Sequence, residues 1–529
     1  MSKLVLVLFL VLMASCAHPR SKPSVKTVSE ADAPQVTSPE NPPGAVSLRP
    51  FKGKPDHVMI LVFDSMRPDY IERFNLKNFK ALQKKSVTYK NAIVGYMGAE
   101  TVVSHLVIPS GQEPKNLPWQ DDVFYDRKGT LGAADRFYST GNLSRSQLWK
   151  LMQSIPAESL LPGELRRTVG GKVFSVAQKP YAALAMGTHQ ADSIVTMKKV
   201  NGKCFPDGIK IPFGIWTQKR FELECSEKYG TEKTYYPLDG NRFVPGNDPE
   251  HQGGDVWVAD VALEIMAHED WSGLFLSFGG MDKIGHMLGQ EDGRDPTHTK
   301  TEWSLEKISQ TADAQLGKIM KELETRDLLK RTILVVTADH GGQEDVHYLG
   351  NGTSGKWGST ANEKPEIPSE WVKKYAQAEH IKFSLQDSAI RIWLKEPAAS
   401  HQEPVLSELK KIPGVASIYQ LEQKNSQWGY AKIATQFEHQ SHRYINWANE
   451  HDLRLINAMA TENAPNLVAL LGDGVGFDLL GDHGGTQEKV QRIPLFMMAP
   501  ALTPAVEAKE VGLKDVKGLI ESRLSVSGG

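Results

Sequence analysis

The chain has 529 residues, more than one ordinary hydrophobic core accommodates, so we expect one large domain with inserted subdomains or two to three domains. Its composition, 40% hydrophobic and 23% charged, is that of an ordinary globular protein, and its formal net charge is −2. This near-neutral charge argues against a protein that holds nucleic acid by general electrostatic attraction.

The first residues have the features of an export signal. Lys3 carries a positive charge, and Leu4 to Met13 form an unbroken apolar run of ten residues. This run is too short to cross a bilayer and fits the core of a signal peptide. Small residues then precede Cys16, an arrangement that resembles a bacterial lipobox, in which the cysteine is acylated and becomes the mature N-terminus. The alternative is an ordinary cleaved signal peptide with an incidental cysteine.

The predicted lipid anchor sets the expected location of the protein. Ala17, rather than Asp, follows Cys16, which by the same resemblance favours the outer membrane, facing the periplasm or the cell surface. The membrane is expected to be contacted through this anchor alone. Export would place Cys204 and Cys225 in an oxidising compartment, so a disulfide and two buried thiols both remain open.

Short apolar runs in the rest of the chain predict strands that are buried on both faces. These runs are Val58–Phe63, Leu274–Phe278, Thr332–Val336, Leu467–Leu471 and Pro494–Met498. Such strands are typical of the centre of a parallel sheet covered by helices, so we predict an α/β fold with a mostly parallel central sheet. Before the third run, apolar residues recur at steps of three and four from Leu305 to Leu323, which predicts an amphipathic helix.

Polar residues with catalytic or metal-binding chemistry follow these predicted strands. After the first four runs come, in order, Asp64, Asp282 with His286, Asp339 with His340, and His483. In open α/β sheets, ligands bind outside the carboxyl ends of the strands, so we expect these side chains to share one site.

The side chains expected at this site are three carboxylates and three imidazoles. Mixed carboxylate and imidazole sets suit Zn²⁺, and two such sets suit a site with two metal ions. A single Asp-His pair is weak evidence, but Asp-His-Gly-Gly occurs twice, each time after a predicted strand. A hydrolytic site of this kind also needs a nucleophile, and Thr101 and Ser104 both offer a hydroxyl that a bound metal ion would activate.

These motifs together resemble the alkaline phosphatase superfamily, in its branch of type I phosphodiesterases, nucleotide pyrophosphatases and threonine-nucleophile alkaline phosphatases. The matching pieces are Asp64, Thr101 with Gly111, Asp282-x-x-x-His286, Asp339-His340-Gly341 and His483-Gly484, and they extend over most of the chain after residue 55. The resemblance implies an alkaline phosphatase-like fold and two divalent metal ions, with Zn²⁺ as the expected metal. It also implies that Thr101, not Ser104, is the nucleophile.

The same resemblance assigns the individual ligands. One metal ion would be held by Asp282, His286 and His483. The other would be held by Asp64, Asp339, His340 and the nucleophile Thr101. Lys179 matches a lysine on the strand that contacts phosphate in the family.

Two residues depart from the family pattern near the expected substrate. Asp122 stands where the family has an asparagine that steadies a phosphoryl oxygen, and a carboxylate there would repel that oxygen unless protonated or metal-bound. Tyr181 stands where the threonine-type monoesterases have an arginine, so a dianionic monoester would lose a bidentate cationic contact. Both departures favour phosphodiesters over phosphomonoesters.

The sequence therefore predicts a metal-dependent phosphoric ester hydrolase that acts through a phospho-threonine intermediate, as a phosphodiesterase or nucleotide pyrophosphatase. Its expected partner is a phosphate ester, with nucleotides among the options. An alkaline phosphatase-type monoesterase is one alternative, and a non-catalytic lipoprotein that retains the fold is another.

The expected domain organisation follows from the positions of the motifs. Segments 112–250 and 346–459 fall outside the strand pattern and are predicted to be insertions over the site. The predicted ranges are a signal peptide at 1–16, a flexible tether at 17–52, and a catalytic core at 53–345 and 460–529.

Overall fold

The computed structural model describes the chain from Arg49 to Ser525 with internal gaps, and all of these residues belong to the compact unit Ala45–Gly529. Cys16, His286 and Cys225 lie outside the described residues, as do the predicted signal peptide and the tether up to residue 48. The described ranges are 49–131, 134–140, 143, 145–200, 203–209, 252–285, 299–343, 347–348, 381–394, 399–412, 414–477 and 483–525.

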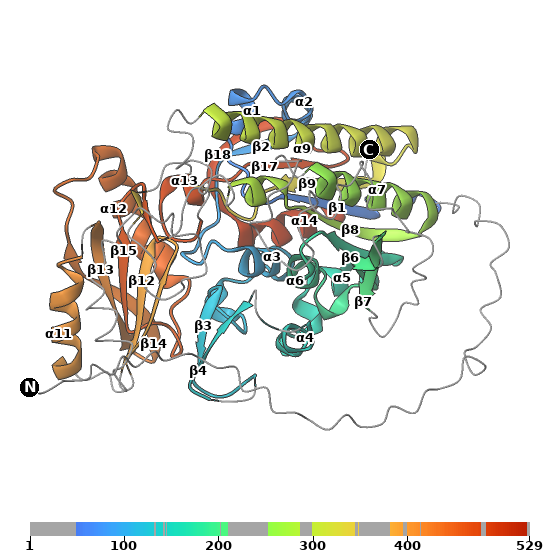
Figure 1. Cartoon of the computed structure of the whole chain (residues 1–529). Helices are drawn as coiled ribbons and strands as arrows, with labels where there is room; N and C mark the ends of the chain where they lie inside the picture. The colour runs from blue at the N-terminus through green and yellow to red at the C-terminus, as the bar shows by residue number, and fades with distance from the viewer. Residues whose placement is uncertain are drawn as a thin grey trace, which may run out of the picture. The chain divides into compact units, whose positions relative to one another are not determined.

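A nine-stranded sheet forms the centre of this unit (Figure 1). In spatial order its strands are β18 (Ala505–Gly512), β2 (Val87–Ile93), β17 (Leu495–Met498), β9 (Thr332–Thr337), β1 (His57–Phe63), β8 (Trp271–Phe278), β5 (Lys172–Ala177), β6 (Ser193–Val200) and β7 (Lys203–Ile209). Five of its eight neighbouring strand pairs are parallel, which confirms the predicted mostly parallel sheet.

The centre of the sheet is apolar because helices cover both of its faces. Every residue of β1, β8 and β9 is buried, as expected for strands between two helical layers. In Figure 1, α2 (Lys77–Lys85), α7 (Gln252–His268) and α9 (Thr299–Thr325) lie along one face, and α3 (Thr101–Ser110), α5 (Leu161–Thr168) and α6 (Pro180–Gly187) along the other. The predicted apolar stripe from Leu305 to Leu323 is buried on α9, which confirms that helix.

The chain enters this domain at the amino ends of the central strands. The guanidinium of Arg49 donates to the carbonyl oxygens of Asp56 and Trp271, both at 3.0 Å, and its Nε lies 3.1 Å from Oδ1 of Asp270. His57 and Trp271 are the first residues of β1 and β8, so Arg49 fixes the entering segment at the edge of the sheet where these strands begin.

A second, five-stranded sheet is entirely antiparallel. In spatial order its strands are β11 (Ile381–Gln386), β12 (Ala389–Leu394), β15 (Leu467–Leu471), β13 (Val415–Lys424) and β14 (Gln427–Thr435). Two helices pack against it, α11 (Ala399–Leu409) through Val405 and Leu409 and α12 (His442–Asn457) through Tyr444 and Ala448. The remaining main elements are α1 (Tyr70–Arg73), β3 (Val123–Asp126), β4 (Arg136–Ser139), α4 (Arg145–Gln153), β10 (His347–Tyr348), β16 (Val475–Gly476), α13 (Glu488–Gln491) and α14 (Val516–Leu524).

The predicted position of one strand is wrong. The apolar run Leu467–Leu471 was expected in the central parallel sheet, but it forms β15 in the middle of the second sheet, antiparallel to β12 and β13. All five of its residues are buried, because the sheet is covered here as well. An apolar run reports burial on both faces and carries no information about which strands are its neighbours.

The structure also shifts the edges of the two predicted insertions. The segment 112–250 contains β5, β6 and β7, which are strands of the central sheet, so this part of the predicted insertion belongs to the core. The second predicted insertion, 346–459, contains most of the five-stranded sheet, but β15 lies beyond its expected end.

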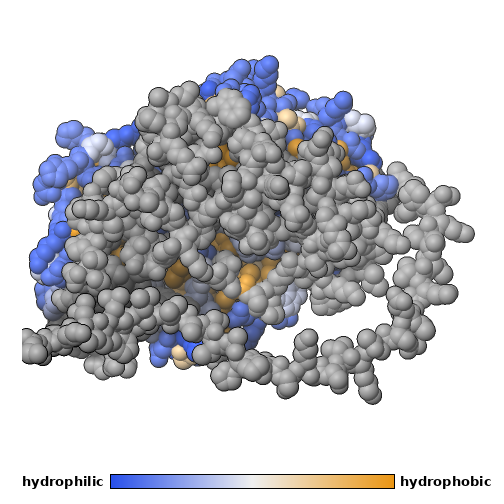
Figure 2. All heavy atoms as spheres, viewed as in Figure 1, coloured by the Kyte–Doolittle hydropathy of each residue, from blue (hydrophilic) through white to orange (hydrophobic). Residues whose placement is uncertain are grey.

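Few large apolar side chains are exposed among the described residues. In the view of Figure 2, the atoms of these residues along the upper margin are mostly hydrophilic. The large apolar side chains exposed among them are scattered, namely Phe51, Trp428, Leu453 and Val506. None of the helices in the described part of the chain combines the length and the apolar composition needed to cross a bilayer.

Candidate active site

Two carboxylates meet where neighbouring parallel strands end. Asp64 directly follows β1 and Asp339 follows β9, and the parallel register of these strands brings their carboxyl ends together. Both side chains have no exposed surface. The backbone N–H of Ser65 donates to Oδ1 of Asp339 at 3.2 Å, and that of His340 donates to the same oxygen at 3.0 Å.

The imidazole of His340 completes this first group. Its Nδ1 lies 2.9 Å from the carbonyl oxygen of Gly341, which can only accept, so Nδ1 carries the hydrogen and Nε2 has a free lone pair. This Nε2 lies 3.5 Å from Oδ1 of Asp64 and 3.4 Å from Oδ2 of Asp339. Within the described residues none of these three atoms has a hydrogen-bond partner, although all are buried.

Such an arrangement fits a cation. Three buried atoms with lone pairs converge, and a positive ion would satisfy all of them at once. Burial lowers the pKa of His340 to about 4 despite the nearby Asp339, so its imidazole is neutral at neutral pH, the form that binds a metal. Burial and the neighbouring Asp339 raise the pKa of Asp64 well above its ordinary value, because they make the ionised carboxylate unfavourable. A bound cation would stabilise the ionised form and lower this pKa.

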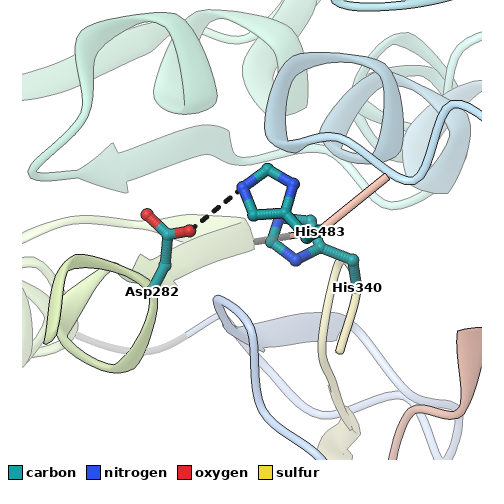
Figure 3. A group of neighbouring side chains, drawn as sticks. All are labelled: Asp282, His340 and His483. Atoms are coloured by element: carbon teal, nitrogen blue, oxygen red, sulfur yellow. Dashed lines mark ion pairs between the residues drawn. The ribbon is translucent and has the colours of Figure 1, made fainter. Parts of the chain in front are cut away.

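A second group lies beside the first and is drawn in Figure 3. Asp282 lies in the helical turn that starts at Gly280, just after β8, and directs its carboxylate at the ring of His483. The distance from Oδ1 of Asp282 to Nε2 of His483 is 3.2 Å. The ring of His483 stacks on that of His340 with centroids 3.8 Å apart. Both Asp282 and His483 are buried, so this second group also has the character of a buried metal site.

The sequence prediction and the structure agree on most of this grouping. Asp64, Asp339 and His340 form one group as predicted, and Asp282 and His483 lie together in the other, with His340 shared between them. The predicted sixth ligand, His286, lies outside the described residues. Their roles as metal ligands remain a prediction.

Thr101 is the first residue of α3 and faces the same region. Its side chain is buried, and its Oγ1 lies 3.3 Å from Nζ of Lys179. His105, one helical turn further along, donates from Nδ1 to the carbonyl oxygen of Thr101 at 2.7 Å and fixes this turn of the helix. Ser104 points elsewhere, because its hydroxyl accepts a hydrogen bond from Tyr96 at 2.8 Å.

Lys179 connects the parts of the site. It lies at the end of the segment that follows β5, directly before α6, and its Nζ is 2.5 Å from Oδ2 of Asp64 and 2.6 Å from Oδ2 of Asp282. Burial would lower the pKa of Lys179, but these carboxylates raise it well above its ordinary value, so the ammonium stays charged. Lys179 was predicted to contact phosphate. Its ammonium lies next to the Thr101 hydroxyl, a position consistent with that role.

The other two predicted substrate contacts are Tyr181 and Asp122. Tyr181 is the second residue of α6, two positions after Lys179. Asp122 lies before β3, and its carboxylate accepts hydrogen bonds from the hydroxyls of Ser139, at 3.2 Å, and Thr140. Contact of either residue with substrate stays a prediction.

Sequence reasoning missed Glu100, the residue directly before Thr101. Its side chain is buried, and its Oε2 lies 2.9 Å from Nδ1 of His483. Burial alone would raise the pKa of Glu100, but the nearby imidazoles of His483 and His340 lower it to about 2, so the carboxylate is ionised. The only sequence signal that could have identified Glu100 is its position, as a carboxylate directly before the apolar segment that forms α3.

Comparisons with known proteins fit this geometry. A family model for type I phosphodiesterases and nucleotide pyrophosphatases matches residues 58–351, which is more than half of the 529-residue chain. No curated protein matches the sequence significantly. Among solved structures, the alkaline phosphatase PafA is similar with a TM-score of 0.60 and 14% identity, over 90% of this chain and 96% of the other.

A nucleotide-acting protein shares the fold as well. Murine ectonucleotide pyrophosphatase/phosphodiesterase 5 is similar with a TM-score of 0.53 and 14% identity, over 89% of this chain and 96% of the other. At these identities the similarities show the fold, which is that of the alkaline phosphatase superfamily, while the family match extends to the sequence itself. The chain therefore belongs to the type I phosphodiesterase/nucleotide pyrophosphatase family and is a hydrolase of phosphoric ester bonds.

Proposed function

We propose that the protein is a phosphodiesterase or nucleotide pyrophosphatase-like hydrolase in which Thr101 is the nucleophile and two Zn²⁺ ions are the cofactor. One observation carries this proposal. The Thr101 hydroxyl lies 3.3 Å from the Lys179 ammonium, and that ammonium contacts Asp64 from one ligand group and Asp282 from the other. The hydroxyl therefore faces the place where the two groups meet.

The donor atoms support Zn²⁺ as the metal. Asp64, Asp339 and His340 would hold one ion, and Asp282 and His483, together with His286, would hold the other. Mixed imidazole and carboxylate ligands suit Zn²⁺ better than Mg²⁺ or Ca²⁺, which prefer oxygen ligands alone. Bound ions would lower the pKa of the Thr101 hydroxyl and neutralise negative charge on the phosphoryl group.

The protein's own residues position the reaction. Thr101 stands in the first turn of α3, where free backbone N–H groups and the helix dipole favour an anionic phosphoryl group. The Lys179 ammonium is placed to contact a phosphoryl oxygen beside the hydroxyl. Thr101 Oγ1 forms a bond to phosphorus as the bond to the leaving oxygen breaks, and water then hydrolyses the phospho-threonine and restores the hydroxyl.

The substrate class is proposed from the residues around Lys179. Tyr181 replaces a monoesterase arginine, and Asp122 adds negative charge where the family has an amide, so a diester with a single negative charge is the better fit. An inactive variant of the murine pyrophosphatase/phosphodiesterase 5 was solved in complex with AMP, which supports nucleotides as candidate substrates. The alternative is a monoesterase, which the similarity in fold to an alkaline phosphatase supports.

Two measurements on the Zn²⁺-loaded protein test this proposal. Rates on bis(p-nitrophenyl) phosphate and p-nitrophenyl phosphate are compared, and we expect the diester to be preferred. Thr101→Ala should lower kcat by at least about 1,000-fold, while Thr101→Ser, which keeps a hydroxyl, should retain measurable turnover. A strong preference for the monoester would favour the alternative, and unchanged turnover in Thr101→Ala would reject the mechanism.

We also propose that the protein is exported and anchored by a lipid on Cys16, at the outer membrane. The apolar run before Cys16 and the small residues beside it support this location. Cys16→Ser should move the protein from the membrane fraction to the soluble fraction, and mass spectrometry of the wild-type N-terminus should detect the acyl chains. An unmodified Cys16 in the mature protein would contradict the proposal.

A further inference from the structure

We propose that Glu100 is a positioning residue that fixes His483 in the orientation in which its Nε2 faces Asp282, and that the β11–β12 turn supports it. The inference rests on the metal ligands of the proposed function. It adds a residue outside those ligands and gives the five-stranded sheet a part in the site.

The contacts of the two ring nitrogens of His483 carry the first step. Nδ1 lies 2.9 Å from Oε2 of Glu100, and Nε2 lies 3.2 Å from Oδ1 of Asp282. A carboxylate can only accept a hydrogen bond, so a neutral His483 that carries its hydrogen on Nδ1, next to Glu100, would have the lone pair of Nε2 directed at the second ligand group. Histidines that bind metal are commonly oriented in this way by a carboxylate on the other nitrogen.

The backbone of Glu100 links this orientation to the nucleophile. Glu100 is the N-cap residue of α3, with φ −123° and ψ 153°, and its carbonyl oxygen accepts from the backbone N–H of Ser104 at 2.9 Å. Its own N–H donates to the carbonyl oxygen of Gly98 at 2.8 Å. Because Thr101 is the next residue, the segment that starts the nucleophile helix also sets the direction of the His483 ring.

The second sheet supports Glu100 from the opposite side. Carboxylate oxygens of Glu100, Asp121 and Asp387 all lie within 4.8 Å of one another, and all three side chains are buried. Arg391, on β12, is 1% exposed and lies between two of them, with Nε 2.5 Å from Oδ2 of Asp121 and Nη2 3.1 Å from Oδ2 of Asp387. The guanidinium offsets the repulsion of this acidic group, so a bound metal ion is not needed there.

The turn between β11 and β12 closes tightly around the same place. Asp387 adopts a positive φ of 56° in this turn, and its carbonyl oxygen accepts from the backbone N–H of Phe477 at 2.8 Å. A Cβ on Gly484, the residue after His483, would lie 2.5 Å from Oε1 of Glu100 and 2.7 Å from Cγ of Asp387. Only glycine therefore allows the His483 segment to pass between these two carboxylates.

The test measures Zn²⁺ binding to the full chain by equilibrium dialysis, without relying on activity. Wild type should bind two ions, and Glu100→Ala should weaken the binding of one of them by about 10- to 100-fold. Glu100→Gln, which keeps the size of the side chain, serves if Glu100→Ala does not fold and should weaken the same ion. The matched control is Glu113→Gln, because Glu113 is partly exposed and forms an ion pair with Lys115. This variant should bind both ions as wild type does.

A double-mutant cycle shows whether Glu100 acts through His483. His483→Ala should weaken the same ion, and adding Glu100→Ala to that variant should cause no further loss. An equal loss from Glu100→Ala in both backgrounds, or unchanged affinity in the single variant, would overturn the inference. Wild type that binds two ions but does not cleave phosphate esters would refute the proposed reaction alone, whereas wild type that binds none would overturn both.

Discussion

Buried ionisable side chains occur outside the site too, and Asp452 on α12 is one of them. It has no exposed surface, and the Tyr419 hydroxyl lies 3.5 Å from its Oδ2. Burial raises its pKa from the ordinary value of 3.8 to about 7, although hydrogen bonds and Lys432 act in the opposite direction. The folded protein therefore holds a proton on Asp452 at pH values where the unfolded chain has lost it.

This proton makes the stability contribution of Asp452 depend on pH. The contribution is fully present below about pH 4 and is lost as the pH rises through 7, because the folded state must then bury a charge. Asp452→Asn does not titrate, so the unfolding free energy of wild type relative to this variant should fall by up to about 4 kcal/mol between pH 4 and pH 8. Urea denaturation of both proteins across this range measures the difference, and a flat difference would contradict the raised pKa.

At the scale of elements, the loop that follows β9 packs directly against α13. The backbone N–H of Gly341 donates to the carbonyl oxygen of Val490 at 2.7 Å. A Cβ at Gly341 would overlap the carbonyl oxygen of Lys489. A glycine here allows a close backbone approach, in this case between the loop that carries Asp339 and His340 and the helix α13.

Gly341→Ala should force this loop and α13 apart. We expect a loss of about 1–3 kcal/mol in unfolding free energy, as for other overpacked positions, together with weaker Zn²⁺ binding by the neighbouring Asp339 and His340. Gly518→Ala is the control, because its Cβ would meet nothing within 4 Å on the exposed side of α14, and it should be neutral or slightly stabilising. Equal stability in the two variants would show that the loop relaxes freely.

Elements with a strong local sequence pattern were predicted correctly. Predictions were wrong or missing where a feature depends on which distant residues become its neighbours in the fold. β1, β8, β9 and α9 were recognised because unbroken apolar runs and a helical stripe report burial directly. β15 was assigned to the wrong sheet because its apolar run is compatible with both. The proximity of Asp64, Asp282, Asp339 and His340 was predicted because each follows an apolar run that forms a strand. Glu100 was missed because its significance depends on His483, a contact that only the folded chain creates.

At the scale of the whole molecule, the site joins segments from distant parts of the chain. Residues after β1, β8 and β9, the start of α3 and the segment at His483 all contribute to it. Mutually repelling carboxylates from these segments come together only in the folded state. A cation that binds there therefore stabilises the entire fold and not one element alone.

Removal of metal should lower the thermal stability of the protein. A ligand present at about 1,000 times its Kd adds roughly 4 kcal/mol to the folded state, so dialysis against a chelator should lower Tm by several degrees and Zn²⁺ should restore it. His340→Ala removes a side chain that both groups share and should show little response to either treatment. Differential scanning calorimetry measures these shifts, and an identical Tm for wild type with and without metal would argue against bound ions.

The anchoring of Arg49 has a practical consequence for handling the enzyme. Arg49 is held where β8 begins, at Trp271, while Asp282 lies beyond the other end of that strand. Eight residues of extended chain separate the two ends by roughly 25 Å, so Arg49 and the candidate active site lie at opposite edges of the sheet. Immobilising the protein on a bead through a tag ahead of Arg49 should therefore leave its turnover of dissolved phosphate esters unchanged.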